Sequence, residues 1–155
     1  YQLITQVSGR AGRKSGKGKV ILQTYNPKHS VFQLIKNNDA AAVYQYFLEE
    51  RRKFHYPPFT RLILIELKHR KEDKTARAAT FLGNVIRKYL PEECIFGPEK
   101  SPIPRLNTYY QYQIMLKLPR GKNYKIFKKC ILQSFDEFDE ITAYRSVKRG
   151  VYVDI

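Results

Sequence analysis

The spacing of apolar residues after Thr60 limits the fold more than any other feature of the chain. Four apolar segments are expected as strands, at 62–69, 93–97, 110–118 and 151–155. Two segments with apolar residues at helical spacing, 74–90 and 127–138, are expected as helices between them. The resulting order βαββαβ predicts an α+β fold, a split βαβ sandwich with an antiparallel sheet and two helices on one face. A loop that carries three prolines is expected at 98–107.

The segment before Thr60 has a less regular pattern of apolar residues. Residues 1–36 are expected to form a helix, a Gly- and Lys-rich loop, a strand at 19–25 and a short helix from about Ser30 to Lys36. A further helix from Ala40 to Arg52 is expected, with Asn38 or Asp39 as its N-cap.

Two adjacent prolines, Pro57 and Pro58, end that helix and mark a hinge. We therefore predict three parts: residues 1–36, a linking helix and double-proline hinge at 37–59, and a self-contained domain at 60–155.

The charge of the chain points to polyanionic partners. Its 155 residues contain 29 Lys and Arg against 14 Asp and Glu, a net charge of +15. Such a balance favours nucleic acid, with an anionic membrane surface as the weaker alternative. No apolar run approaches the roughly 20 residues that span a bilayer, so we expect no membrane partner.

The sequence offers little for metal binding or nucleophilic catalysis. Its two cysteines and three histidines are dispersed, so no metal site is expected and the thiols are expected to be buried and reduced. The acidic cluster at 136–140 is expected to be a solvated helix end. The single methionine, the start at Tyr1 and the end inside a predicted strand indicate a fragment of a longer protein.

The sharpest local motif is the run Gln-Val-Ser-Gly-Arg-Ala-Gly-Arg at residues 6–13. Arg10 and Arg13 are three residues apart, so on a helix their guanidinium groups would project in similar directions and converge on one phosphate. Gly9 and Gly12 would let backbone approach closely. A solvated basic turn is the simpler alternative for such a run.

This motif resembles motif VI of superfamily 2 helicases. Further runs, Glu50-Arg51-Arg52, Tyr56-Pro57-Pro58-Phe59, Phe96-Gly97-Pro98 and Gln113-Ile114-Met115-Leu116, resemble the C-terminal part of the primosomal replication-restart helicases, the primosomal protein N′ (PriA) family. The resemblance covers essentially the whole chain.

The resemblance implies an ATP-dependent DNA helicase that unwinds 3′ to 5′, restarts stalled replication forks and assembles the primosome. It places residues 1–36 at the end of the second, RecA-like helicase lobe, with Gln6 and Gly9 binding ATP and Arg10 and Arg13 facing its γ-phosphate. Residues 60–155 would then be the C-terminal DNA-binding domain. It also implies a cytoplasmic, nucleoid-associated protein.

The family's Walker A lysine, acidic Mg²⁺ motif and cysteine-rich zinc module are absent from this sequence. Residues 12–18 do not fit the Walker A pattern. ATP, Mg²⁺ and zinc are therefore expected in the parent protein only, and no cofactor or ATP hydrolysis is expected for the fragment.

A second candidate site follows from charge alone. From Lys100 to Phe135 there are eight basic residues and no acidic one: Lys100, Arg105, Lys117, Arg120, Lys122, Lys125, Lys128 and Lys129. Tyr109 is expected on the outer face of its strand, where its ring would stack on a base. We predict DNA binding by the following residues: Arg105, Tyr109, Lys117, Arg120, Lys122, Lys125 and Lys129. A merely solubilising basic surface is the alternative, and an RNA-binding or ribosome-associated module is the alternative function.

Lys122 and Lys125 also suit an acidic peptide, because they lie three residues apart at the start of a predicted helix. The resemblance implies one such partner, the acidic tail of the single-stranded-DNA-binding protein. Forked or single-stranded DNA and other primosome proteins are the remaining expected partners.

Overall fold

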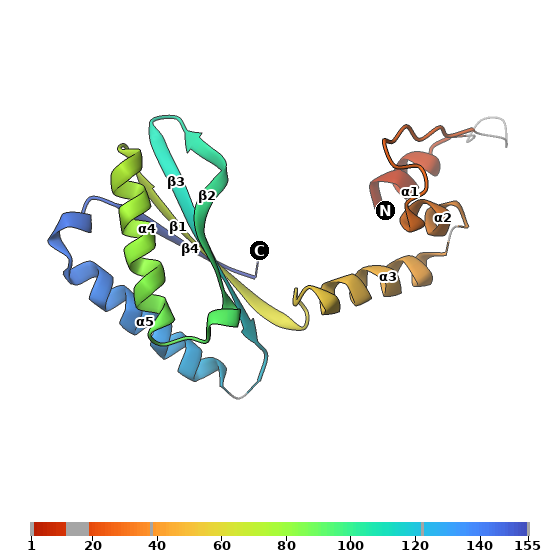
Figure 1. Ribbon diagram of the computed structural model, residues 1–155. Helices are drawn as coiled ribbons and strands as arrows, with labels where there is room; N and C mark the ends of the chain where they lie inside the picture. Colours follow the sequence, from red (N-terminus) through yellow and green to blue (C-terminus); the bar gives the residue numbers. More distant parts are fainter. Residues whose placement is uncertain (1, 12–18, 38, 122, 155) are drawn as a thin grey trace. The chain divides into compact units, whose positions relative to one another are not determined.

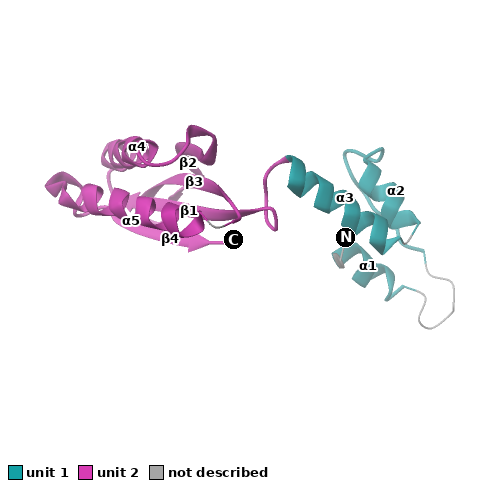
Figure 2. Ribbon diagram, turned by 90° about the horizontal axis from the view of Figure 1, so that it is seen from below, with its two compact units in different colours: residues 1–53 teal, residues 54–155 magenta. Residues whose placement is uncertain are grey.

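The computed structural model describes residues 2–11, 19–37, 39–121 and 123–154. The chain divides into two compact units, Tyr1–Lys53 and Phe54–Ile155 (Figure 2). The division falls within the segment 37–59 that the sequence marks as a linker.

Among its described residues, unit 1 contains three helices, α1 (Gln2–Ser8), α2 (Ser30–Lys36) and α3 (Ala40–Lys53). The predicted N-cap of α3 is confirmed at Asp39, whose Oδ1 accepts a hydrogen bond from the Ala42 amide at 2.9 Å. Asn38, the other predicted cap, lies outside the described residues.

The strand predicted at 19–25 is wrong, because these residues have no regular secondary structure. A strand is stable only when its amides and carbonyls pair with a neighbouring strand. Unit 1 has no strand among its described residues, so the β-prone run Val20-Ile21-Leu22 has no sheet to join.

Unit 2 is built on a four-stranded sheet whose strands are β1 (Thr60–His69), β2 (Ile95–Leu106), β3 (Tyr109–Pro119) and β4 (Lys148–Val153), in the order β2-β3-β1-β4. All three strand pairings are antiparallel. The prediction of an α+β fold with an antiparallel sheet is therefore confirmed. Figure 1 shows β1 and β3 at its centre.

The loop predicted at 98–107 is wrong, since β2 continues through it to Leu106. Proline cannot donate to a ladder of hydrogen bonds, but an edge strand tolerates it where its amides face outward or at irregularities. β2 is an edge strand, and its pairing with β3 shifts register between Phe96 and Glu99 and again between Lys100 and Arg105. Every proline of this segment falls within one of those two shifts.

Helices α4 (Glu72–Arg87) and α5 (Tyr124–Glu140) pack on one face of the sheet (Figure 1). Their apolar stripes meet alternate residues of the two central strands, such as Ile65 and Ile114, which are fully buried. Two short 3-10 helices, Glu92–Cys94 and Thr142–Tyr144, precede β2 and β4. The helices predicted at 74–90 and 127–138 are confirmed, and α4 begins two residues earlier than expected.

The opposite face of the sheet carries no helix among the described elements of unit 2. Residues on this face include Lys117 and Met115 of β3 and their partners Leu62 and Leu64 of β1. The sheet thus separates an apolar core from a face that polar and charged side chains occupy in part.

Candidate nucleic-acid interface

In unit 1, α1 presents Gln6 as an exposed side chain. The helix ends at Ser8, and the Gly9 and Arg10 amides then donate to Thr5 and Val7 carbonyls at 2.9 and 3.1 Å. Arg10 therefore lies in an exposed turn, at the start of the segment that the sequence predicts as a loop. Gly9 ends the helix because glycine has a low helix propensity. Arg13 lies outside the described residues.

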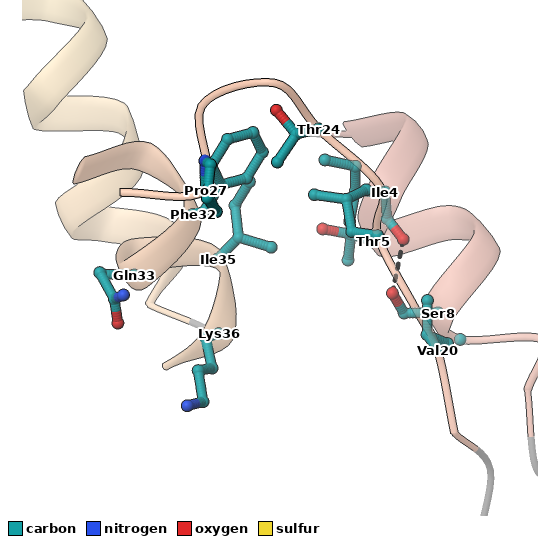
Figure 3. Close-up of a pocket in the computed structure, with 12 residues that line it drawn as sticks. Ile4, Thr5, Ser8, Val20, Thr24, Pro27, Phe32, Gln33, Ile35 and Lys36 are labelled. Atoms are coloured by element: carbon teal, nitrogen blue, oxygen red, sulfur yellow. Dashed lines mark hydrogen bonds between the residues drawn. The ribbon is translucent and has the colours of Figure 1, made fainter. Parts of the chain in front are cut away.

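A groove of about 800 Å³ lies beside this turn, within unit 1. Figure 3 shows Ile4 of α1 facing Ile35 of α2 across it, with Ser8 donating a hydrogen bond to the Ile4 carbonyl at 2.6 Å. The lining mixes apolar side chains with five polar ones: Thr5, Ser8, Thr24, Gln33 and Lys36. It offers no acidic or histidine side chain for a proton transfer.

In unit 2, the first half of α5 forms a basic surface. Phe127, Ile131 and Phe135 turn toward the core, so the helical period leaves Lys125, Lys128 and Lys129 exposed. Lys122, which precedes the helix, lies outside the described residues. Within the described residues, no carboxylate forms an ion pair with these three lysines, and they make the start of α5 strongly positive.

A pocket of about 380 Å³ adjoins this surface, and we call it the α5 pocket: Arg61, Arg120, Gly121, Tyr124 and Lys125. The guanidinium carbon of Arg61 lies 4.5 Å from the centre of the Tyr124 ring. The same guanidinium group bonds to the Asp154 carboxylate at 3.3 Å. Arg120 is exposed, so its charge and that of Lys125 are available to an anion.

Sequence reasoning missed Arg61, which lies 59 residues before Arg120. The two arginines meet only because β1 pairs with the end of β3, with Arg61 opposite Leu118. Nothing in the local sequence around Arg61 signals this neighbour.

Lys117, a predicted phosphate ligand, is engaged within unit 2. Its ammonium group donates to the Phe54 carbonyl at 2.8 Å and lies 3.9 Å from the centre of the Tyr56 ring. It also lies 4.8 Å from the Phe96 ring centre. These contacts fix the segment before β1 against the sheet, which is a structural role for the lysine.

Arg105 is exposed near the end of β2, with its guanidinium carbon 5.2 Å from the Tyr110 ring centre. Lys100, another of the eight cations, forms an ion pair with Glu72 at 2.6 Å. The hydrogen bond from Lys100 to this carboxylate raises the pKa of the lysine. Residues 100–135 contain no acidic side chain, but the fold brings Glu72 from α4 next to one of their cations.

Tyr109 lies on the sheet face opposite the helices, as predicted from its alternation with Tyr110. Cations accompany its ring, with the Lys148 ammonium 4.7 Å and the Arg70 guanidinium carbon 6.0 Å from its centre. The proximity of Lys148, and to a smaller extent that of Arg70, lowers the pKa of the phenol. Neither cation was predicted as a site residue, because each comes from a different part of the chain.

A separate polar cluster joins the turn after α4 to α5. The Glu137 carboxylate accepts hydrogen bonds from the Tyr89 phenol and from the Lys88 ammonium, the latter at 2.9 Å. These two hydrogen bonds lower the pKa of Glu137, and the bond from Tyr89 has the larger effect. Cys94 is buried, and this burial raises the pKa of its thiol.

The described residues contain no group of three or more His, Cys, Asp and Glu side chains placed to hold a metal ion. Within the same part of the chain, no helix has the length and apolar character needed to cross a membrane.

The chain is similar in sequence to known proteins. Residues 52–155 match the model of the primosomal protein N C-terminal domain family. A protein of Bacillus subtilis described as replication restart protein PriA is 37% identical over 136 residues, which are 87% of this chain and 17% of that protein. Proteins with the same description from Synechocystis and Treponema pallidum are 34% and 28% identical over 77% and 99% of this chain.

The chain spans 14% to 22% of the length of these relatives. The RNA-binding or ribosome-associated alternative finds no support in these similarities. The family match over residues 52–155 and these relatives show that the chain belongs to the PriA family, as the C-terminal part of a replication restart protein.

Proposed function

We propose that this chain is the C-terminal part of an ATP-dependent 3′ to 5′ DNA helicase that restarts stalled forks and assembles the primosome, and that unit 2 binds DNA. The observation that carries the proposal is the α5 pocket with the exposed lysines that follow it on α5. The relatives are described as replication restart proteins, which supports the cellular role.

The DNA contact is electrostatic. Arg120, Lys125, Lys128 and Lys129 supply four exposed cations over one helix and the loop before it. Each phosphate neutralised by a cation releases condensed counterions, which contributes about −0.9 to the log-log salt slope on duplex DNA. Four such contacts give a slope of about −3.6. Lys122, Arg105 and Tyr109 remain proposed contacts, and Lys117 acts by holding the segment around Phe54.

Unit 1 is proposed as the end of the second helicase lobe. Arg10 in its exposed turn, together with Gln6 and Gly9, fits a place at the edge of an interlobe cleft, where a guanidinium would bind the γ-phosphate of ATP. In the parent, ATP and Mg²⁺ would be held mainly by residues outside this chain, and so would zinc. Arg10 and Arg13 are proposed to stabilise negative charge on the transferred phosphoryl group.

The connection from β1 through α4 to β2, with β3 between the two strands, suits a split βαβ sandwich. The family's replication role favours a cytoplasmic, nucleoid-associated protein. The isolated chain is proposed to bind without hydrolysing ATP, since its sequence lacks the Walker A lysine.

A second candidate partner is the acidic tail of single-stranded-DNA-binding protein. The observation that favours it is Ile126, 61% exposed between Lys125 and Phe127, which places an apolar side chain beside the cations. Acidic peptides that carry apolar residues match such mixed surfaces. An acidic peptide of this kind should compete with DNA for Lys125.

The test is fluorescence anisotropy of the 155-residue chain with forked DNA, plain duplex and an RNA hairpin of matched charge, over a salt series. We expect tighter binding to the fork at every salt concentration, with a negative salt slope. Equal or tighter binding to RNA would contradict the proposed role in restart. Absence of binding to any of the three would contradict nucleic-acid binding by unit 2 altogether.

A further inference from the structure

Tyr109 marks a second concentration of positive charge in unit 2, away from the α5 pocket. Lys68 of β1 lies opposite Lys148 of β4 in the register, and opposite Gln111 of β3 on its other side. Tyr109 is two residues from Gln111, so it shares their sheet face, the one opposite the helices. Arg70 follows directly after β1.

Two of these cations have no carboxylate partner. Lys68 forms an ion pair with Glu66 at 2.7 Å. Within the described residues, no carboxylate pairs with Arg70 or Lys148, and both side chains are exposed. Both instead contact the ring of one tyrosine, at 6.0 and 4.7 Å from its centre.

The Tyr109 ring stands between two cations, where an anion would be expected. The Lys148 ammonium and the Arg70 guanidinium group converge on this one ring, and their proximity lowers the pKa of the Tyr109 phenol. Cations placed opposite one another on a sheet, as Lys68 and Lys148 are, repel each other. A ligand with several negatively charged oxygens relieves this repulsion better than a neutral phenol does.

We propose that Arg70, Tyr109 and Lys148 form a second binding site for a phosphodiester of the nucleic-acid backbone. The inference rests on the proposed function of unit 2, and it adds a contact that the α5 surface does not provide. Arg70 and Lys148 bind the phosphate oxygens, and the Tyr109 hydroxyl holds both cations in place before the nucleic acid arrives.

The two sites lie at opposite ends of β1. Arg61 of the α5 pocket stands near the start of the strand and Arg70 just after its end, nine residues apart, which corresponds to about 30 Å of extended chain. A strand of 20 nucleotides is long enough to contact both sites, since neighbouring phosphates on one strand of duplex are about 3.4 Å apart along the axis.

The test compares salt slopes for a 20-nucleotide single-stranded poly(dT), measured by anisotropy with the 155-residue chain. Arg70→Ala with Lys148→Ala should flatten the log-log slope by about 1.4, because each phosphate contact on a single strand contributes about 0.7. Between 50 and 200 mM salt, the variant should therefore lose about sevenfold less affinity than the unaltered chain.

The matched control removes two cations from α4 and its C-cap, Arg77→Ala with Lys88→Ala, both of which pair with carboxylates. The control should leave the slope unchanged. A slope that is equally flattened in both variants would show a general charge effect and overturn the site. Arg70→Gln with Lys148→Gln repeats the test with longer side chains if the alanine variant melts early.

Two further arms separate the possible failures. A poly(dT) with an uncharged methylphosphonate backbone should bind the unaltered chain and the Arg70, Lys148 variant equally, and a preserved difference would overturn phosphate recognition. The unaltered chain could bind poly(dT) with a slope that Lys125→Glu flattens and that Arg70→Ala with Lys148→Ala does not. In that case the inference fails and the proposed function stands. If the unaltered chain binds no nucleic acid, both fail.

Discussion

Gly97, at the start of β2, is the position where a single methyl group should cost most. Its φ is +95°, and a Cβ built there would lie 2.9 Å from the Gln113 carbonyl oxygen of β3 and 3.1 Å from the Glu99 amide. Its own carbonyl accepts a hydrogen bond from the Arg87 guanidinium at 2.6 Å. The run Phe96-Gly97-Pro98 thus requires glycine for both conformation and space.

Gly97→Ala should lower the free energy of unfolding by about 3 kcal/mol. Holding a residue other than glycine at such a φ costs roughly 1–3 kcal/mol, and we take about 2. Because the clash is with backbone, β2 must also move away from β3 and weaken at least one hydrogen bond, which adds about 1 kcal/mol. For a domain near 100 residues, this total predicts a fall in Tm of about 12–24 °C.

Gly121→Ala is the matched control. Gly121 has a φ of +152°, but a Cβ there would meet nothing within 4 Å. This variant should show the conformational cost alone, about 1 kcal/mol less than Gly97→Ala. Urea unfolding and thermal melting followed by circular dichroism measure both. Equal losses in the two variants would refute the argument from the Gln113 carbonyl.

Three other predictions concern charge. Lys125→Glu with Lys129→Glu should flatten the log-log salt slope on duplex DNA by about two, measured by anisotropy, and an unchanged slope would remove α5 from the interface. The Tyr89 hydrogen bond lowers the pKa of Glu137 below 4.5, so its contribution to stability is complete above about pH 4.5 and is lost as pH falls through the lowered pKa. Urea unfolding from pH 6 to 3 should show this loss, and Glu137→Gln should show a weaker one; identical profiles would argue against it. In the full-length parent, Arg10→Ala should abolish ATPase activity and leave fork binding nearly intact, whereas a lowered Tm would indicate a structural role.

The candidate sites were only partly predictable. The exposed lysines of α5 followed from helical period, because the face opposite Phe127, Ile131 and Phe135 must meet solvent. Arg61 was not predictable, since its proximity to the α5 pocket depends on the register between β1 and β3. Arg70 and Lys148, the partners of Tyr109, were not predictable either, because they also reach it through pairing between strands.

Local sequence pattern was enough to predict the elements whose side chains follow one clear period: β1, β3, α4 and α5 in unit 2. Local period also fixed which face of α5 is basic, because turn geometry decides it within a few residues. Tertiary structure decided the rest. The prolines of β2 are compatible with a strand only at a sheet edge, and the apolar run 20–22 lacks a strand to pair with. Charges that meet across strands, such as those around Tyr109, depend on contacts between distant residues, and no local pattern records which residues those will be.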